Sequence, residues 1–191
     1  EFSLMSVGNG TDFWPMPISQ DHKRAYDGDK GPNTGGMGAY SPVPQIGQDV
    51  VDTAIETIVK PTVQAMADGG TPFTGILYAG LIATADGPKV IEFNARFGDP
   101  ETEVVLPKLT SDLGAGISAL LNGETPEFTW DNDNATLGVV LAADGYPVNV
   151  IKGATIPELR VDEDSHVYYA GVARSEEGLI ANSGRGLLVE T

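Results

Sequence analysis

The clearest pattern in this sequence is an alternation of apolar and polar side chains over residues 91–97. Side chains of a β-strand point alternately to its two faces, so every second residue shares a face. The pattern predicts an apolar face, which we expect to pack in the core, formed by Ile91, Phe93, Ala95 and Phe97. It also predicts a polar face, formed by Glu92, Asn94 and Arg96.

Turn residues between runs of strand character predict two β-hairpins. Residues 2–7 and 12–16 flank Gly8-Asn9-Gly10, a sequence that favours a tight turn. Residues 75–83 and 89–96 flank a second turn that contains Gly and Pro. The residues around the polar strand face are therefore expected to belong to the second hairpin.

Helical periodicity appears in three parts of the chain. Apolar residues recur on one face over residues 48–67, where Pro61 is expected to break or kink the helix. The pattern returns at residues 101–106 and 112–121. Gly123 then fits the C-terminal stop of the last helix.

The remaining segments predict a long loop and a strand-rich end. Residues 19–44 are rich in Gly, Pro, Asn and Asp, and a structureless loop of such length is uncommon unless it binds something. After about residue 130 the chain shows short strand patterns between Gly and Asp turns and no helical pattern. The elements together predict an α+β fold, with a mainly antiparallel sheet and helices in residues 1–129 and a small β-rich domain in residues 130–191.

Composition and charge narrow the possible functions. The 191 residues include 27 acidic and 11 basic side chains and no cysteine, and the net charge is −16. This charge argues against a nucleic-acid surface, and the lack of a long apolar run argues against a membrane span. The lack of cysteine excludes disulfides and fits a cytoplasmic protein. A local basic cluster is formed by His22, Lys23, Arg24 and Lys30. In this otherwise acidic chain it is either a phosphate-binding site or a charged, solvated loop.

The polar strand face carries groups that suit a metal and a phosphate. Carboxylate and amide oxygens, as on Glu92 and Asn94, are ligands that Mg²⁺ accepts together with phosphate oxygens. A guanidinium such as that of Arg96 can bind a phosphate through two parallel hydrogen bonds. A solvated strand face without a ligand is the alternative interpretation of the same three residues.

Four longer motifs, in order along the chain, closely resemble the phosphoribosylamine–glycine ligase family of ATP-grasp enzymes. They are Gln20-Asp21-His22-Lys23-Arg24, the segment from Gly31 to Pro42, the segment from Thr74 to Leu81, and the segment from Val90 to Thr102. Residues 137–147 also resemble the start of that family's C-terminal domain. The resemblance covers essentially the whole chain and implies the C-terminal lobe of an ATP-grasp fold for residues 1–129.

The resemblance implies a reaction in purine biosynthesis. ATP phosphorylates the carboxylate of glycine, and the amine of 5-phosphoribosylamine then attacks the glycyl phosphate, which gives glycinamide ribonucleotide, ADP and phosphate. Phosphoryl transfer concentrates negative charge, so Mg²⁺ or Mn²⁺ and cationic side chains are expected in the site.

The resemblance also assigns roles to individual residues. Glu92 and Asn94 match the metal ligands, and Arg96 matches an arginine near the transferring phosphate and the glycine carboxylate. Lys23, also expected to be catalytic, should face phosphates or the substrate. The residues expected to bind phosphates or substrates are Asp21, His22, Arg24, Gly35, Gly36, Gly38, Asp99 and Glu101. Within that set, Asp99 and Glu101 are expected near the amine substrate, and Asp21 is expected to pair with the glycine ammonium.

Both ends of the sequence have strand character, which predicts a piece of a longer polypeptide. The N-terminal domain and the lid lobe of the family are then expected to precede Glu1, and the C-terminal domain to be truncated. We expect the isolated chain to be inactive and to self-associate through strand edges exposed at Phe2, Leu4 and residues 187–189. The alternatives are another ATP-grasp ligase, such as a biotin-dependent carboxylase component, and a non-catalytic domain.

Overall fold

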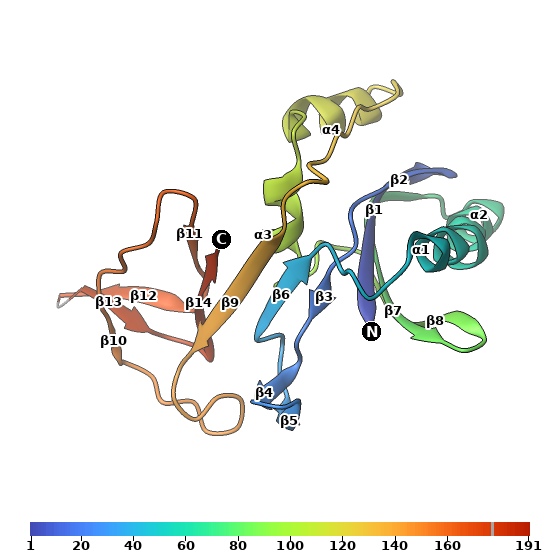
Figure 1. Ribbon diagram of the computed structural model, residues 1–191. Coiled ribbons are helices and arrows are strands. Elements are labelled where there is room, and N and C mark those ends of the chain that lie inside the picture. The colour runs from blue at the N-terminus through green and yellow to red at the C-terminus, as the bar shows by residue number, and fades with distance from the viewer. Residues whose placement is uncertain (177) are drawn as a thin grey trace.

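The computed structural model describes residues 1–176 and 178–191. Figure 1 shows a part in which helices lie beside a sheet and a second part built from strands, with α4 (Leu113–Leu121) extending from the region between them. No helix in the described part of the chain is long and apolar enough to cross a membrane.

The first sheet has four antiparallel strands in the order β2-β1-β7-β8. The strands are β1 (Phe2–Gly10), β2 (Asp12–Pro15), β7 (Phe73–Thr84) and β8 (Gly87–Asn94). Both predicted hairpins are confirmed, because β1 pairs with β2 and β7 pairs with β8.

A long helical segment covers one face of this sheet. It consists of α1 (Gln48–Ala54), a π-helical turn at Ile55–Val59 and α2 (Lys60–Asp68). The helix was expected to break or kink at Pro61. It does not break there, and the kink stays a prediction. The helix continues through the π-helical turn, a local change from i→i−4 to i→i−5 hydrogen bonding, into α2. Buried side chains of the helix and of the sheet form one core cluster, made of Phe2, Leu4, Ala54, Val59, Val63, Leu77, Ala79 and Leu81.

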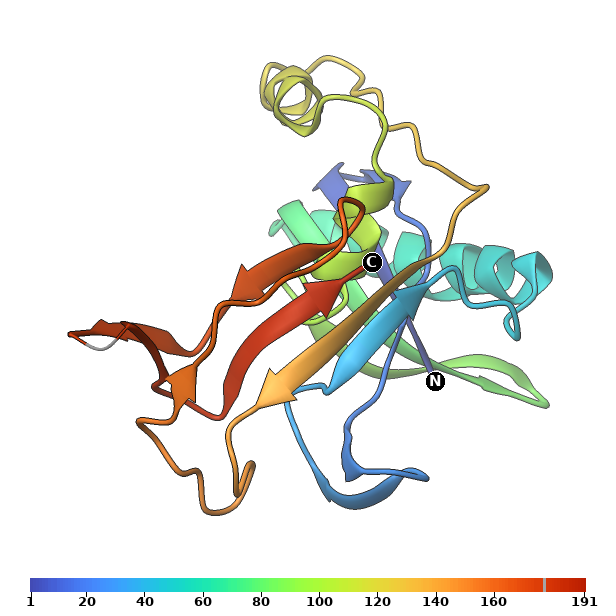
Figure 2. The ribbon, with the colours of Figure 1, turned by 60° about the vertical axis from the view of Figure 1, so that its left-hand side comes forward.

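The second sheet has five strands in the order β11-β14-β9-β6-β3. The strands are β3 (Gln20–Asp21), β6 (Gly38–Ser41), β9 (Thr136–Ala142), β11 (His166–Tyr169) and β14 (Arg185–Glu190). Figure 2 shows β6 in blue beside β9 in orange and β14 in red. The prediction of a structureless loop over residues 19–44 is wrong, because β9 supplies a pairing partner from a distant part of the chain.

The remaining elements are short. The ribbon of β4 (Arg24–Tyr26) and β5 (Lys30–Asn33) also lies within the predicted loop, and β10 (Thr155–Ile156), β13 (Gly178–Ala181) and β12 (Val172–Ser175) form a small sheet. The helix α3 (Thr102–Val105) leads through a 3-10 turn at Leu106–Lys108 towards α4. Gly123 has a φ of 76°, and its N–H donates to Leu120, as expected for a glycine that ends a helix.

The predicted domain boundary at 129/130 separates strands that share one sheet. β3 and β6 come before it and β9, β11 and β14 come after it, so hydrogen bonds between β6 and β9 cross the boundary. The boundary itself stays a prediction. The predicted exposed strand edges are wrong. Phe2 and Leu4 are buried, and this part of β1 pairs with β7 on one side and forms the Ser3–Ser19 bridge on the other. β14 lies between β11 and β9.

A bulge in β8 changes the predicted division of its side chains. Gly80 pairs with Glu92 and Leu81 pairs with Val90, so Ile91 is an additional residue. The core face predicted for this strand is therefore wrong, and Ile91 and Phe93 are 47% and 41% exposed. The reason is that β8 is the edge strand of its sheet. Within the predicted apolar set, Phe97 does pack against a buried cluster.

Candidate functional site

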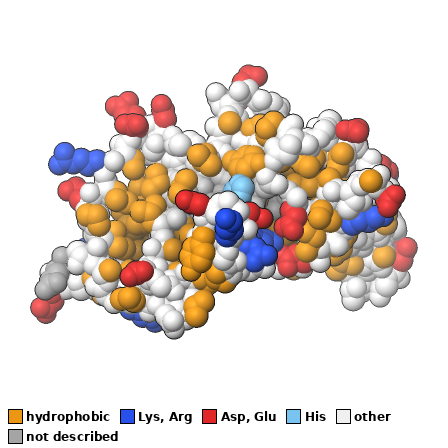
Figure 3. All heavy atoms as spheres, turned by 60° about the horizontal axis from the view of Figure 1, so that its bottom comes forward, with side chains coloured by type: hydrophobic (Ala, Val, Ile, Leu, Met, Phe, Trp, Pro, Cys, Tyr) orange, Lys and Arg blue, Asp and Glu red, His pale blue; other side chains and the backbone are white. Residues whose placement is uncertain are grey.

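A pocket of about 270 Å³ lies where the two sheets meet, and we call it the central pocket. Loops and strands from four separate parts of the sequence form its wall. The lining residues are Asp21, Lys23, Asn33, Thr34, Gly35, Tyr78, Glu92, Asn94, Arg96, Gly98, Asp99 and Glu101. Eight of the residues predicted from the sequence are therefore brought together. Figure 3 shows one face of the molecule on which Lys, Arg, Asp and Glu side chains gather near the middle, with hydrophobic side chains on both sides.

Glu92 and Asn94 reach the central pocket from β8. They lie opposite Gly80 and Tyr78 on β7, and a side chain at Gly80 would crowd Glu92, since an added Cβ atom would lie 3.2 Å from its Cγ. Neither the Glu92 carboxylate nor the Asn94 amide has a hydrogen-bond partner among the residues that the structure describes. Their oxygens are thus free to bind a hard divalent cation, for which this donor set is suitable.

Cationic groups lie at two positions on the wall. Arg96 follows β8 and donates one hydrogen bond to the carbonyl of Phe97 at 2.9 Å, which leaves other N–H groups of its guanidinium available. The Nζ atom of Lys23 lies 4.0 Å from a carboxylate oxygen of Asp21. Burial raises the pKa of Asp21, the Glu101 charge adds to this effect and Lys23 opposes it.

A hydrogen-bonded group of three residues forms the buried side of the pocket. The carboxylate of Glu101, which is 3% exposed, accepts hydrogen bonds from Tyr78 at 2.7 Å and from Ser3 at 3.0 Å. Burial raises the pKa of the Tyr78 hydroxyl strongly, and the neighbouring Glu101 charge raises it further. Tyr78 therefore acts as a fixed neutral donor to Glu101. It was missed in the sequence, where it is a single tyrosine in an apolar strand.

The three predicted glycines have different positions. Gly35 lines the central pocket, and its N–H donates to the Tyr146 hydroxyl at 3.0 Å. Gly36 has a φ of 111° and lies against the ring of Pro100, so a side chain there would clash. Gly38 approaches the backbone of Gly138 equally closely. Gly36 and Gly38 are thus explained by close packing, and neither is part of the pocket wall.

His22 and Arg24 lie in a neighbouring pocket beside β4 and β5. The His22 ring stacks on Tyr40 with 5.8 Å between ring centroids, and Arg24 donates to the carbonyl of Gly31 at 2.8 Å. The structure therefore brings Asp21 and Lys23 to the central pocket, whereas His22 and Arg24 lie outside it. Their predicted binding roles stay predictions.

A second residue that the sequence analysis missed is Arg185. Its guanidinium forms a bidentate ion pair with the Asp99 carboxylate, with N–O distances of 2.8 and 3.1 Å. No local motif marks this arginine, because its partner lies 86 positions earlier in the chain.

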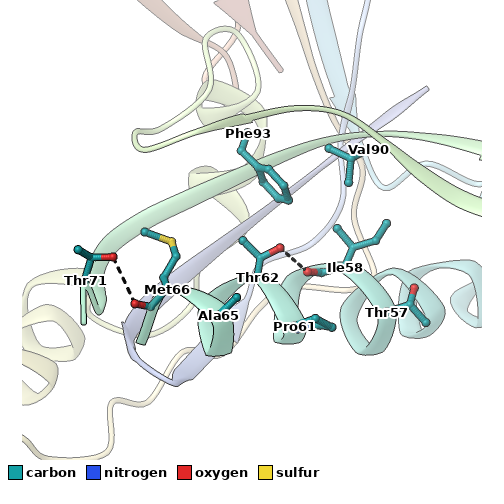
Figure 4. A pocket seen from close by; sticks show the side chains of 9 residues that line it. All are labelled: Thr57, Ile58, Pro61, Thr62, Ala65, Met66, Thr71, Val90 and Phe93. Atoms are coloured by element: carbon teal, nitrogen blue, oxygen red, sulfur yellow. Dashed lines mark hydrogen bonds between the residues drawn. The ribbon is translucent and has the colours of Figure 1, made fainter. Parts of the chain in front are cut away.

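The opposite side of β8 is apolar. Val90 and Phe93 face α2 across a groove of about 590 Å³, whose lining contains no ionisable side chain. Figure 4 shows Phe93 above Thr62 and Val90 above Ile58, with the Thr62 hydroxyl donating to the carbonyl of Ile58. Strand β8 thus separates a polar pocket from an apolar groove.

The sequence model of the family described as "Phosphoribosylglycinamide synthetase, ATP-grasp (A) domain" matches residues 1–102, and the chain belongs to this family. The predicted family resemblance and the predicted α+β fold of the ATP-grasp type are both confirmed.

Relatives with assigned names agree with this result. A protein from Streptococcus pyogenes serotype M6, named phosphoribosylamine–glycine ligase, is 56% identical over 100% of this chain and 46% of its own length. A protein of the same name from Listeria innocua is 57% identical over 99% of this chain and 45% of its own length. The crystal structure of phosphoribosylamine–glycine ligase from Thermotoga maritima matches with a TM-score of 0.87 at 36% identity, covering 100% of this chain and 47% of that one. The chain thus spans about half the length of these relatives.

Proposed function

We propose that this chain forms part of a phosphoribosylamine–glycine ligase, which joins glycine to 5-phosphoribosylamine at the expense of ATP. One observation carries the proposal: a single pocket is lined by Glu92, Asn94, Arg96 and Lys23. The chain that forms this pocket belongs to the matching family. A metal-binding pair beside two cations is the arrangement that phosphoryl transfer to a carboxylate requires.

The residues of the chain then have distinct tasks. Glu92 and Asn94 hold Mg²⁺ or Mn²⁺ through oxygens that are not engaged elsewhere in the described structure. Arg96 and Lys23 orient anionic groups of the substrates from two sides of the pocket. ATP, when bound with its cation, supplies the phosphoryl group that converts the glycine carboxylate into an acyl donor.

The acidic residues that line the central pocket bind the amino groups of the substrates. Asp21, Asp99 and Glu101 line the same pocket and favour a substrate that carries an ammonium group. The Tyr78 and Ser3 hydroxyls hold Glu101 in place, so its position does not depend on a ligand. A cytoplasmic location and the lack of nucleic-acid or membrane partners stay predictions.

The test is ADP release by the full-length protein that contains this sequence. We expect release that requires glycine, 5-phosphoribosylamine and a divalent cation together, and loss of release in Glu92→Gln. Glu124→Gln, a charge loss at an exposed position after α4, is the matched control. ADP release that depends on bicarbonate and biotin instead of glycine would overturn the proposal and favour a carboxylase.

A further inference from the structure

Arg185, the first residue of β14, connects two loops that form the wall of the central pocket. Its guanidinium donates to both carboxylate oxygens of Asp99 and lies 3.5 Å from the carbonyl oxygen of Gly36. A planar guanidinium that binds a carboxylate through two hydrogen bonds fixes orientation as well as distance. The loop at residues 98–101 and the loop at residues 35–38 are therefore held by the same side chain.

The local backbone explains why Arg185 points towards these loops. Arg185 pairs with Ala142, and Leu187 pairs with Leu141, so Gly186 is an additional residue in β14. Such a bulge redirects the neighbouring side chains of a strand. The guanidinium consequently leaves the sheet at its end and is largely covered, with 23% of the side chain exposed.

The glycine loop has little freedom once Arg185 is in place. A Cβ atom added at Gly35 would lie 3.1 Å from the guanidinium carbon, and the N–H of Gly35 already donates to Tyr146. Both Arg185 and Tyr146 come from the second half of the chain. Asp99 and Gly35 line the central pocket, whereas Arg185 is outside its lining.

We propose that Arg185 is a positioning residue, which sets the geometry of the central pocket by holding the Asp99 loop against the glycine loop. The kinetic part of this inference rests on the proposed function. Its structural part does not, because the contacts exist in the chain without any substrate.

Hydrogen exchange of the full-length protein without substrates tests the structural part. In Arg185→Gln we expect amide exchange at residues 35–38 and 98–101 to rise at least about tenfold, with the first sheet unchanged. Arg174→Gln makes the same change on an exposed side chain of β12 and should leave both loops as they are. Unchanged exchange at both loops in Arg185→Gln would overturn the proposal.

Kinetics then separate positioning from direct contact with a substrate. We expect Arg185→Gln to lower kcat/KM at least about tenfold, and Arg185→Lys to lower it less, since Lys keeps the charge and loses the planar fork. If Arg185 acts through Asp99, the double variant with Asp99→Asn should lose no more than the worse single variant. Additive losses would overturn the proposal. Raised exchange in a protein that has no glycine-dependent turnover would disprove the proposed function and leave the positioning role standing.

Discussion

The Tyr78 hydroxyl and the Glu101 carboxylate form a 2.7 Å hydrogen bond beneath the central pocket. Ser3 donates to the same carboxylate oxygen, so β1, β7 and the turn before α3 meet at one buried charge. A buried carboxylate is costly unless donors surround it. The pocket thus has an acidic group whose position is set by the fold.

Removal of the Tyr78 hydroxyl should therefore destabilise the protein. We expect Tyr78→Phe to lower the free energy of unfolding by about 1–3 kcal/mol, because a buried charged acceptor loses a donor. Urea unfolding measures the change. Tyr26→Phe removes the same group from an exposed side chain and should change the free energy of unfolding little. Equal effects of the two changes would show that the bond to Glu101 contributes nothing.

The metal assignment predicts a sharp loss of turnover. In the full-length protein, Glu92→Gln or Asn94→Ala should lower kcat/KM at least about tenfold, equivalent to about 1.4 kcal/mol, while the fold stays intact. The fold should persist because both side chains lie on the pocket side of an edge strand. The assay is ADP release over a series of cation concentrations, with circular dichroism as the check of folding. Near-normal activity at limiting Mg²⁺ in either variant would contradict the assignment.

Arg96 should act on the transition state. Arg96→Lys keeps the positive charge and loses the planar arrangement of donors, so we expect kcat to fall at least about tenfold, or about 1.4 kcal/mol. Steady-state kinetics with varied ATP and varied glycine measure the effect. A higher KM for ATP with unchanged kcat would instead identify Arg96 as a ground-state binding residue.

Asp21 should make stability depend on pH. Its pKa is raised, chiefly by burial, so the folded protein binds the proton more tightly than the unfolded chain does. Stability then falls as pH rises through the raised pKa. Asp21→Asn should be more stable than the wild type at pH 7, and the difference should vanish below about pH 4, the region of the pKa of a free aspartate.

Unfolding of Asp21→Asn at several pH values checks this expectation. Asp86→Asn, in the exposed turn between β7 and β8, serves as the control and should show no such trend. A difference between Asp21→Asn and the wild type that is the same at pH 4 and pH 7 would contradict the raised pKa.

Elements with local signals could be predicted from the order of the residues alone. The β7–β8 hairpin follows from strand-forming residues around a turn, and the end of α4 follows from a glycine that accepts a positive φ. The polar side of β8 was also readable, because Glu92 and Asn94 are two residues apart on a strand. Such features can be predicted from local patterns because they depend only on interactions between residues that are close in the sequence.

The way in which distant segments complete the site depends on the folded chain. The bulge at Ile91 depends on how β8 aligns with β7, and alternation along one strand cannot reveal it. The strand β6 exists because β9, almost a hundred residues later, provides its hydrogen-bond partners. The pairs Tyr78–Glu101 and Asp99–Arg185 likewise join residues far apart in the chain. Their geometry depends on burial and on the packing of one sheet against the other, which no local pattern of residues specifies.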